Sequence, residues 1–482
     1  MRYEPVIGLE IHAQLLTATK IFCGCSTTFG APPNTHVCPV CLGLPGALPV
    51  LNRRAVELAV RAGLALGCTI APRSIFARKN YFYPDLPKGY QISQYDQPLA
   101  TAGRLELGSE AVTPVVGITR VHMEEDAGKS LHHGQPDSHR ATAVDFNRAG
   151  VPLIEIVTEP DLRSAADAAD CFTRIREVLV ALGVNDGNME EGSLRCDANV
   201  SVRPAGQSTL GTKTEVKNVN SFRFLQKALE FEIERQIELL EAGGRVVQET
   251  RLWDSDLGET TSMRTKEDAH DYRYFPEPDL QPLDVPAAWV DAIRAALPEL
   301  PEARKARLMA SYELSDYDAD LLVRLIRGGA DYFERTVAAG ASPKAASNWI
   351  QGEIRRRLKD AGTDDIGAVP VDPEHLAELI AVAERGVVSS TSAKDVFEKM
   401  WETGRRAQAI IDEEGLAQSG DEDAIRSLVA TVLADNADAV AEFRKGRTNV
   451  LGFLVGQVMK QGKGRVNPKV ASELVRQALT LH

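Results

Sequence analysis

A strictly alternating segment near the N-terminus constrains the fold of this chain more than any other feature. Between Ile7 and Leu15 every odd position is apolar, and the even positions include Glu10 and His12. A period of two places alternate side chains on opposite faces of a β-strand. The segment therefore predicts a strand with one buried and one polar face. A carboxylate beside an imidazole suits a divalent metal or proton transfer, although a solvated strand face would give the same pattern.

Polar strand faces recur later in the chain. Acidic residues follow or interrupt strand-like runs near 120–126 and 151–158, and alternation returns at 194–203 and 214–217. Charges close to a core must be paired or bind metal, so several polar faces together predict one concave, charged site. Such a site fits Mg²⁺ and phosphate chemistry. The candidate catalytic residues on all these segments are Glu10, His12, Glu124, Glu125, Glu155, Asp197, Asn199 and Lys217.

Four cysteines form two close pairs in a loop rich in glycine and proline. The pattern is C-x-C, twelve residues, then C-x-x-C, and it comprises Cys23, Cys25, Cys38 and Cys41. Four thiolates can close a tetrahedral site with no open position, so we expect one structural Zn²⁺. The alternative is four free thiols in a reducing compartment. The other three cysteines lie in apolar patterns and are expected in the core: Cys68, Cys171 and Cys196.

Length and periodicity predict an α+β chain in three parts. At about 150 residues per domain, 482 residues suggest roughly three domains. Strand patterns dominate up to the prolines near 298–301, and helical periodicity follows, as at 320–337 and 394–401. We expect a large domain with an antiparallel sheet over 1–293, an all-helical domain over 294–408 and a small helical tail over 409–482. A helix is expected at 221–242 and a linker or long loop at 412–423.

Charge and missing motifs exclude several classes of protein. The net charge of −13 excludes a wholly basic nucleic-acid-binding chain, and no apolar run approaches the ~18 residues of a membrane span. The N-terminus has no signal-peptide pattern, so we expect a cytoplasmic protein. There is no G-x-x-x-x-G-K-[ST], no G-x-G-x-x-G and no amidase signature. Any ATP chemistry must use an unusual site, and any ammonia must come from elsewhere.

The C-terminal forty residues reverse the charge of the chain. Between Phe443 and His482 the only acid is Glu473. A cluster of positive charges suits binding to a polyanion, and RNA is the natural candidate. The alternative is a solvated helix surface. The basic residues expected to contact RNA are Arg444, Lys445, Arg447, Lys460, Lys463, Arg465 and Lys469.

Long strings along nearly the whole chain resemble one family, the B subunits of the tRNA-dependent amidotransferases. They include GLEIHAQL, KNYFYPDLPKGYQISQYD, VDFNRAGVPLIEIVTEPD, EGSLRCDANVSVR, TEVKNVNSFR, SMRTKEDAHDYRYFPEPDL and the tail string VNPKVASELV. One departure is Asn147, where the family often has arginine.

The resemblance implies a fold, an activity and partners. It implies a cradle-shaped N-terminal domain in a heterotrimer, in which the A subunit is an amidase and the C subunit is small. The B subunit would phosphorylate the side-chain carboxylate of Glu-tRNA(Gln), Asp-tRNA(Asn) or both, using ATP and Mg²⁺. Ammonia channelled from the amidase would then displace phosphate. A non-discriminating aminoacyl-tRNA synthetase is a further expected partner.

Roles for particular residues follow from the resemblance and the expected chemistry. The expected Mg²⁺ ligands, or residues next to them, are Glu10, His12, Glu124, Glu125 and Glu155, while Asp197, Asn199 and Lys217 lie on the same wall. The expected channel exit comprises Lys79, Tyr81, Tyr83 and Lys88. One rival is a zinc-stabilised scaffold that binds tRNA without chemistry of its own. Another is a free-standing ligase that uses free ammonia on a small molecule.

Overall fold

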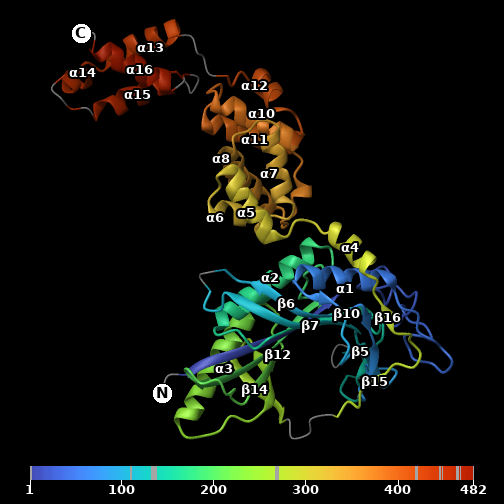
Figure 1. The fold of residues 1–482 in the computed structure, drawn as a ribbon. Helices are drawn as coiled ribbons and strands as arrows, with labels where there is room; N and C mark the ends of the chain where they lie inside the picture. Colours follow the sequence, from blue (N-terminus) through green and yellow to red (C-terminus); the bar gives the residue numbers. More distant parts are fainter. Residues whose placement is uncertain are drawn as a thin grey trace. The chain divides into compact units, whose positions relative to one another are not determined.

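The computed structural model describes residues 3–108, 111–131, 138–265, 271–417, 422–444, 447, 449–462, 466 and 468–480. The chain divides into two compact units, residues 1–300 and 301–482. The first unit contains the sheets, and the second is helical (Figure 1). The expected α+β class is thereby confirmed.

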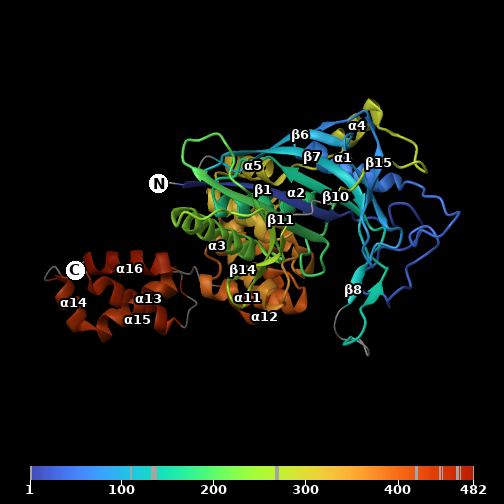
Figure 2. The same ribbon diagram turned by 90° about the horizontal axis from the view of Figure 1, so that it is seen from below.

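A nine-stranded sheet organises the first unit, in the order β14-β13-β12-β11-β1-β10-β7-β6-β2. Neighbouring strands pair antiparallel except β12 and β13, which are parallel. Figure 2 shows β1, β10 and β7 side by side. The strands are β1 (Tyr3–Gln14), β2 (Thr69–Ile70), β6 (Ala100–Glu106), β7 (Val115–Glu125), β10 (Pro152–Thr158), β11 (Leu194–Pro204), β12 (Thr214–Lys217), β13 (Glu249–Asp254) and β14 (Glu259–Thr265).

Three small sheets complete the strands of this unit. The three-stranded one joins β15, β4 and β5, and two ribbons pair β16 with β3 and β8 with β9. Their bounds are β3 (Arg73–Ser74), β4 (Phe76–Asn80), β5 (Tyr90–Gln94), β8 (Lys129–Leu131), β9 (Ala143–Asp145), β15 (Phe275–Pro276) and β16 (Leu283–Asp284). Because β5 packs against β7, this part of the fold brings β4 and β5 to the end of the large sheet.

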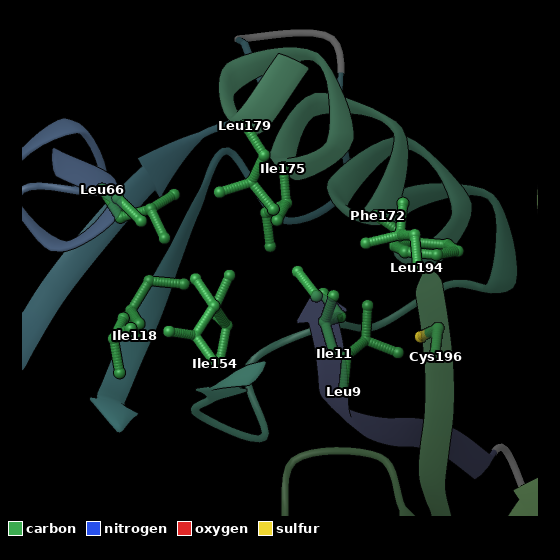
Figure 3. Close-up of a cluster of buried hydrophobic side chains, with 14 of the residues drawn as sticks. Leu9, Ile11, Leu66, Ile118, Ile154, Phe172, Ile175, Leu179, Leu194 and Cys196 are labelled. Carbon is green, nitrogen blue, oxygen red and sulfur yellow. The ribbon is translucent and has the colours of Figure 1, made fainter. Parts of the chain in front are cut away.

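Helices cover the apolar face of the large sheet. They are α1 (Arg53–Ala65), α2 (Ala165–Ala181), α3 (Phe222–Glu241) and, next to α1, α4 (Ala287–Ala295). Figure 3 shows Phe172, Ile175 and Leu179 of α2 pointing toward the sheet residues Leu9 and Ile11. From Ile7 onward the odd positions of β1 are buried as its alternation predicts, so the even positions lie on the opposite, polar face.

The second unit contains two separate hydrophobic cores. The elements around the first are α5 (Pro301–Tyr312), α6 (Asp316–Asp320), η1 (Leu321–Leu325), α7 (Gly329–Ala338), α8 (Pro343–Trp349), η2 (Ile350–Ile354), α9 (Arg355–Asp360), η3 (Ile366–Ala368), α10 (Pro373–Glu384), α11 (Ser390–Thr403) and α12 (Ala407–Glu414). Those around the second are α13 (Glu422–Asp435), α14 (Ala437–Arg444), α15 (Val450–Gln461) and α16 (Pro468–Thr480).

The predictions for individual elements had different outcomes. The helix at 221–242 is confirmed as α3, with Ser221 capping its N-terminus by accepting a hydrogen bond from the Phe224 amide. The helical periodicity at 320–337 corresponds to two segments, η1 and α7, because the chain becomes extended at Ile326 and left-handed at Gly328 (φ 76°). The start of the expected linker is wrong, since α12 continues through Glu414 and ends where Gly415 turns left-handed.

Candidate functional site

The polar face of the large sheet carries a row of three side chains from three adjacent strands. In β1, β10 and β7, His12 lies opposite Glu155, which in turn lies opposite His122. Directly opposite residues of antiparallel strands point to the same face. The Nε2 atom of His12 is 3.2 Å from Oε2 of Glu155, and Nε2 of His122 is 3.6 Å from the same oxygen. Pairing register thus gathers groups that lie far apart in the sequence.

Glu124 completes this cluster from the end of β7. Its Oε1 lies 3.9 Å from Nε2 of His12, and its side chain is buried. One ligand atom each from His12, Glu124 and Glu155 lies within 4.8 Å of the others, and we call these three residues the acid triad. The donor set fits a divalent cation, because carboxylate oxygens are the ligands that Mg²⁺ prefers.

Electrostatics in the acid triad favour a bound cation. Burial and the neighbouring Glu155 raise the pKa of Glu124. Burial alone would also raise the pKa of Glu155, but the hydrogen bond from His12 and nearby positive charges lower it. Burial opposes protonation of His12, yet its hydrogen bond to Glu155 raises its pKa. Two close buried carboxylates repel each other, so a shared positive charge stabilises the pair.

Lys79 of β4 supplies one such charge. Burial disfavours its charged form, but the carboxylates of Glu124 and Glu155 hold the pKa of Lys79 above its ordinary value. Its Nζ lies 5.1 Å from the ring centroid of Tyr272 and 5.9 Å from that of Tyr81. A cation fixed by aromatic faces next to two carboxylates can neutralise an anionic substrate group that enters the triad.

A second polar group lies on the same face, toward the other edge of the sheet. Glu10 is directly opposite Asp197 in β1 and β11, and it accepts a hydrogen bond of 2.9 Å from Nδ2 of Asn199. Nζ of Lys217 donates to Asp197 over 2.7 Å. These four residues extend the polar face of the sheet, and they form hydrogen bonds with one another. Glu10 is not among the residues that the structure gathers into the acid triad.

Glu125 lies on the opposite side of the sheet from Glu124. Consecutive residues of a strand point to opposite faces, so the sequence neighbours separate. The Glu125 carboxylate forms an ion pair with Lys88 and accepts a hydrogen bond of 2.8 Å from the Ile92 amide. The structure therefore does not bring Glu125 to the acid triad, contrary to the expectation that both glutamates face one metal.

Glu125 and Lys88 instead line a cavity of about 190 Å³ that also reaches the cysteine loop. Its walls include Cys23, Cys41 and the buried Lys20. Gln91 lies between Glu125 and Tyr81: its Nε2 donates to the Glu125 carbonyl over 2.7 Å, and its Oε1 lies 3.5 Å from the Tyr81 hydroxyl.

The four predicted cysteines converge. Their sulfur atoms all lie within 4.8 Å of one another, in Cys23, Cys25, Cys38 and Cys41. The Cys38 and Cys41 sulfurs are 3.9 Å apart, close to the roughly 3.8 Å that a tetrahedron of 2.3 Å Zn–S bonds requires. The cluster can hold a structural metal, and its chemistry fits Zn²⁺. The expectation that Cys68, Cys171 and Cys196 are core residues is confirmed, since all three are buried.

Lys20 lies against this cysteine cluster and stabilises it. It is fully buried, and its Nζ donates to the His36 carbonyl over 2.7 Å, to the Phe146 carbonyl over 3.3 Å and to the Cys41 sulfur over 3.6 Å. A hydrogen bond from Cys23, opposed by burial and assisted by Lys20, lowers the pKa of Cys41 to about 4. A buried ammonium offsets the negative charge that four thiolates would bring.

Two family models match the chain. One described as GatB/GatE catalytic domain matches residues 5–291, and one described as GatB domain matches residues 331–479. The B subunit of the aspartyl/glutamyl-tRNA(Asn/Gln) amidotransferase of Geobacter sulfurreducens is 56% identical over 479 residues, 99% of this chain and all of the relative. The proteins of the same name from Moorella thermoacetica and Geotalea daltonii are 56% and 54% identical over equal shares.

The chain belongs to the family of amidotransferase B subunits. It is therefore an enzyme component of ligase type, and the acid triad lies within the segment that matches the catalytic-domain model. None of the helices described in the structure is both long and apolar enough to cross a membrane.

The basic tail of this amidotransferase chain is described only in part. Lys460 is exposed in the last turn of α15, and the exposed Arg447 pairs with Glu442 over 3.0 Å. Arg444 and Lys469 lie in α14 and α16. Lys445, Lys463 and Arg465 lie outside the described residues. The expectation of a tRNA-binding tail stays a prediction.

Sequence reasoning missed several residues of the site. His122 completes the cross-strand row, and its position two residues before Glu124 was a usable signal, since period two puts both on one face. Tyr272 and Tyr274 reach Lys79 from a segment far along the chain. Asp126, just past β7, is buried and accepts hydrogen bonds from Gln14 and Arg195. For the tyrosines and Asp126, it is the tertiary fold that brings them near the other groups.

Proposed function

We propose that this chain activates the side-chain carboxylate of a glutamate or aspartate esterified to tRNA(Gln) or tRNA(Asn), using ATP. The observation that carries the proposal is the acid triad, two buried carboxylates and an imidazole on a catalytic-domain sheet. The relatives' name supplies the two tRNAs and the transfer of an amide group.

The chemistry explains why activation is needed. A carboxylate does not react with ammonia at neutral pH, because oxide would be the leaving group. In the proposed first step, a carboxylate oxygen of the substrate attacks the γ-phosphorus of ATP, which gives an acyl phosphate and releases ADP. Ammonia then attacks the carbonyl carbon, phosphate leaves, and the extra proton passes to a base. Positioning and charge neutralisation do most of the work in phosphoryl transfer.

Residues of the acid triad would hold Mg²⁺. When bound, Mg²⁺ neutralises charge on the phosphates and orients them. Glu124 and Glu155 provide the oxygen ligands, and His12 orients Glu155 by donating a hydrogen bond. Lys79 adds a fixed cation for the transferring phosphoryl group. Glu10, Asp197, Asn199 and Lys217 form the wall that faces the rest of the substrate.

Ammonia would reach the triad from the cavity beside the cysteine cluster. Lys88 and Glu125 line that cavity, Gln91 and Tyr81 continue the polar path, and Lys79 marks its exit near the carboxylates. We assign Tyr83, whose ring meets that of Tyr81, to the substrate side of this exit. Glu125 thereby has a role in ammonia passage rather than as a metal ligand.

The remaining parts of the proposal concern stability and partners. Zn²⁺ in the cysteine cluster would be structural, since four thiolates leave no open position. The catalytic, helical and tail domains, at 1–293, 294–408 and 409–482, would act in a cytoplasmic heterotrimer whose other members are an amidase (the A chain) and a small C chain. The tail would bind tRNA, and an aminoacyl-tRNA synthetase would deliver it.

The test is ADP formation by the complex reconstituted from this chain, the amidase and the small third chain. We expect ADP only when acylated tRNA and Mg²⁺ are both present, and amide product when glutamine or ammonium is added. If the chain were a scaffold without chemistry of its own, substitutions in the acid triad would not change the rate of ADP formation by the complex. A free-standing ligase predicts activity on small acids without tRNA.

A further inference from the structure

Five tyrosines form a continuous row beside the acid triad. Ring centroids are 6.4 Å apart for Tyr83 and Tyr81, 5.9 Å for Tyr81 and Tyr272, and 6.0 Å for Tyr272 and Tyr274. Tyr95 ends the row, 4.1 Å from Tyr274. Three separate chain segments contribute these rings, so the tertiary fold assembles the row.

Lys79 and Ser93 link the row to the triad. Lys79 interacts electrostatically with Glu124 and Glu155, and its Nζ lies 5.1 Å from the ring centroid of Tyr272. At the Tyr95 end, the hydroxyl of Ser93 donates to Oε2 of Glu124 over 3.3 Å. Tyr95 follows Ser93 by two residues, or about 7 Å of extended chain. A nucleotide that rests on Tyr95 therefore has its sugar within reach of the triad.

Tyr95 presents an open aromatic surface. Its side chain is 55% exposed, while its ring lies parallel to that of Tyr274, with an interplanar angle of 5°. Parallel packing fixes the orientation of the outer ring before any ligand arrives, which lowers the entropy cost of binding. A half-exposed ring held flat in this way is suited to stacking with a planar group.

We propose that the Tyr95–Tyr274 stack holds the 3′-terminal base of the acylated tRNA, an inference that rests on the proposed function above. Unpaired nucleotides are bound by stacking on aromatic side chains, largely without regard to sequence. That property fits a protein whose relatives are named for two different tRNAs, because such tRNAs share their single-stranded 3′ end. The open edge at Tyr95 admits a polymer end from solvent and directs its amino acid toward Glu124.

The adenine of ATP is the other source of the same chemistry, and kinetics distinguish the two. In the reconstituted complex, Tyr95→Leu should raise the KM for Glu-tRNA(Gln) by roughly 5- to 100-fold, the range that the loss of one stacked base implies. The KM for ATP should change less than about twofold. Tyr95→Phe keeps the ring and should behave like the unchanged complex, and Tyr317→Leu, an exposed tyrosine of the helical unit, serves as the surface control.

A binding experiment gives a readout apart from catalysis. Uncharged tRNA that lacks its terminal nucleotide should bind the unchanged complex more weakly than intact tRNA, and Tyr95→Leu should remove that difference. An increased KM for ATP alone, or an undiminished preference for intact tRNA in Tyr95→Leu, overturns the assignment. Failure of the unchanged complex to form ADP would instead reject the proposed function, so the two failures are distinct.

Discussion

His12 and Glu155 face each other across β1 and β10, with Nε2 of the imidazole 3.2 Å from Oε2 of the carboxylate. His122 approaches the same oxygen at 3.6 Å from the other side. A carboxylate flanked by two imidazoles is restricted in orientation, and under the proposed function its other oxygen would bind a cation shared with Glu124. Preorganised charge of this kind is the main contribution that an enzyme makes to phosphoryl transfer.

Loss of the Glu155 carboxylate should therefore stop activation of the substrate. Glu155→Gln should lower the rate of ADP formation with acylated tRNA by about 10²–10³-fold. Added ammonium should not restore amide product, because the missing step precedes ammonia attack. Glu159→Gln, an exposed glutamate beyond the end of the same strand, is the control. Normal ADP formation by Glu155→Gln would contradict the metal assignment.

Substitution of the Lys88–Glu125 ion pair, on the other side of the sheet, should give a defect that added ammonium does rescue. Lys88→Met or Glu125→Gln should reduce amide formation from glutamine, since both residues line the proposed ammonia path. Ammonium in the medium should bypass the path and restore most of the product. ADP formation measured with ammonium present should stay near normal. An activity that ammonium fails to recover would place these residues in the chemical step.

Zinc content and stability should fall together when the cysteine cluster is broken. Cys38→Ser removes one of four converging sulfurs, so the protein should lose bound zinc and melt several degrees lower. Cys68→Ser alters a buried cysteine outside the cluster and should keep its zinc. Elemental analysis alongside calorimetry makes the comparison. Zinc-free protein purified without chelator, with an unchanged melting temperature, would reject the structural metal.

Asp126 should make stability sensitive to acid. Burial would raise its pKa, but Arg195 and Arg148 hold the pKa of Asp126 below the ordinary 3.8. A lowered folded-state pKa stabilises the fold above pH 3.8 and loses that contribution as pH falls further. Urea unfolding between about pH 5 and pH 3 should show a shallower decline for Asp126→Asn than for the unchanged chain. Equal slopes would mean that Asp126 titrates alike in both states.

Contacts of the tail with RNA phosphates should appear in the salt dependence of binding. Lys460 is exposed at the end of α15, and Lys460→Gln should weaken tRNA binding most at low salt. The slope of log affinity against log salt should decrease by roughly 0.7–0.9 for each phosphate that the variant no longer neutralises. Lys359→Gln, an exposed lysine of α9, is the matched control. An unchanged slope would remove Lys460 from the interface.

Sequence patterns predicted elements well wherever burial imposed a strict period. Alternation in β1 correctly separated Leu9 and Ile11 from the polar face, and the helix stop after α3 followed from its glycines. Spacing alone predicted the convergence of the cysteines, because short loops bring close pairs together. The break at Gly328 was missed, since apolar periodicity continues on either side of it and hides the change in backbone conformation.

The sequence could not predict equally well which residues form the candidate metal site. Pairing register decides which residues of β1, β10 and β7 become neighbours, and register depends on the whole sheet. Glu10 was expected at the metal because it shares a face with His12, yet it lies across from Asp197 instead. Tyr272 arrives at Lys79 through a long-range contact that no local pattern signals.

Because Glu124 and Glu125 are consecutive, the end of β7 separates the acid triad from the cavity lined by Lys88. One backbone position separates the carboxylate that faces the acid triad from the one that faces Lys88. A residue inserted ahead of Met123 would bring Met123 to the triad position and turn Glu124 toward Lys88, so the acid triad would lose one of its carboxylates. The strand should therefore keep its length ahead of Glu124, and aligned homologues should show no insertion there.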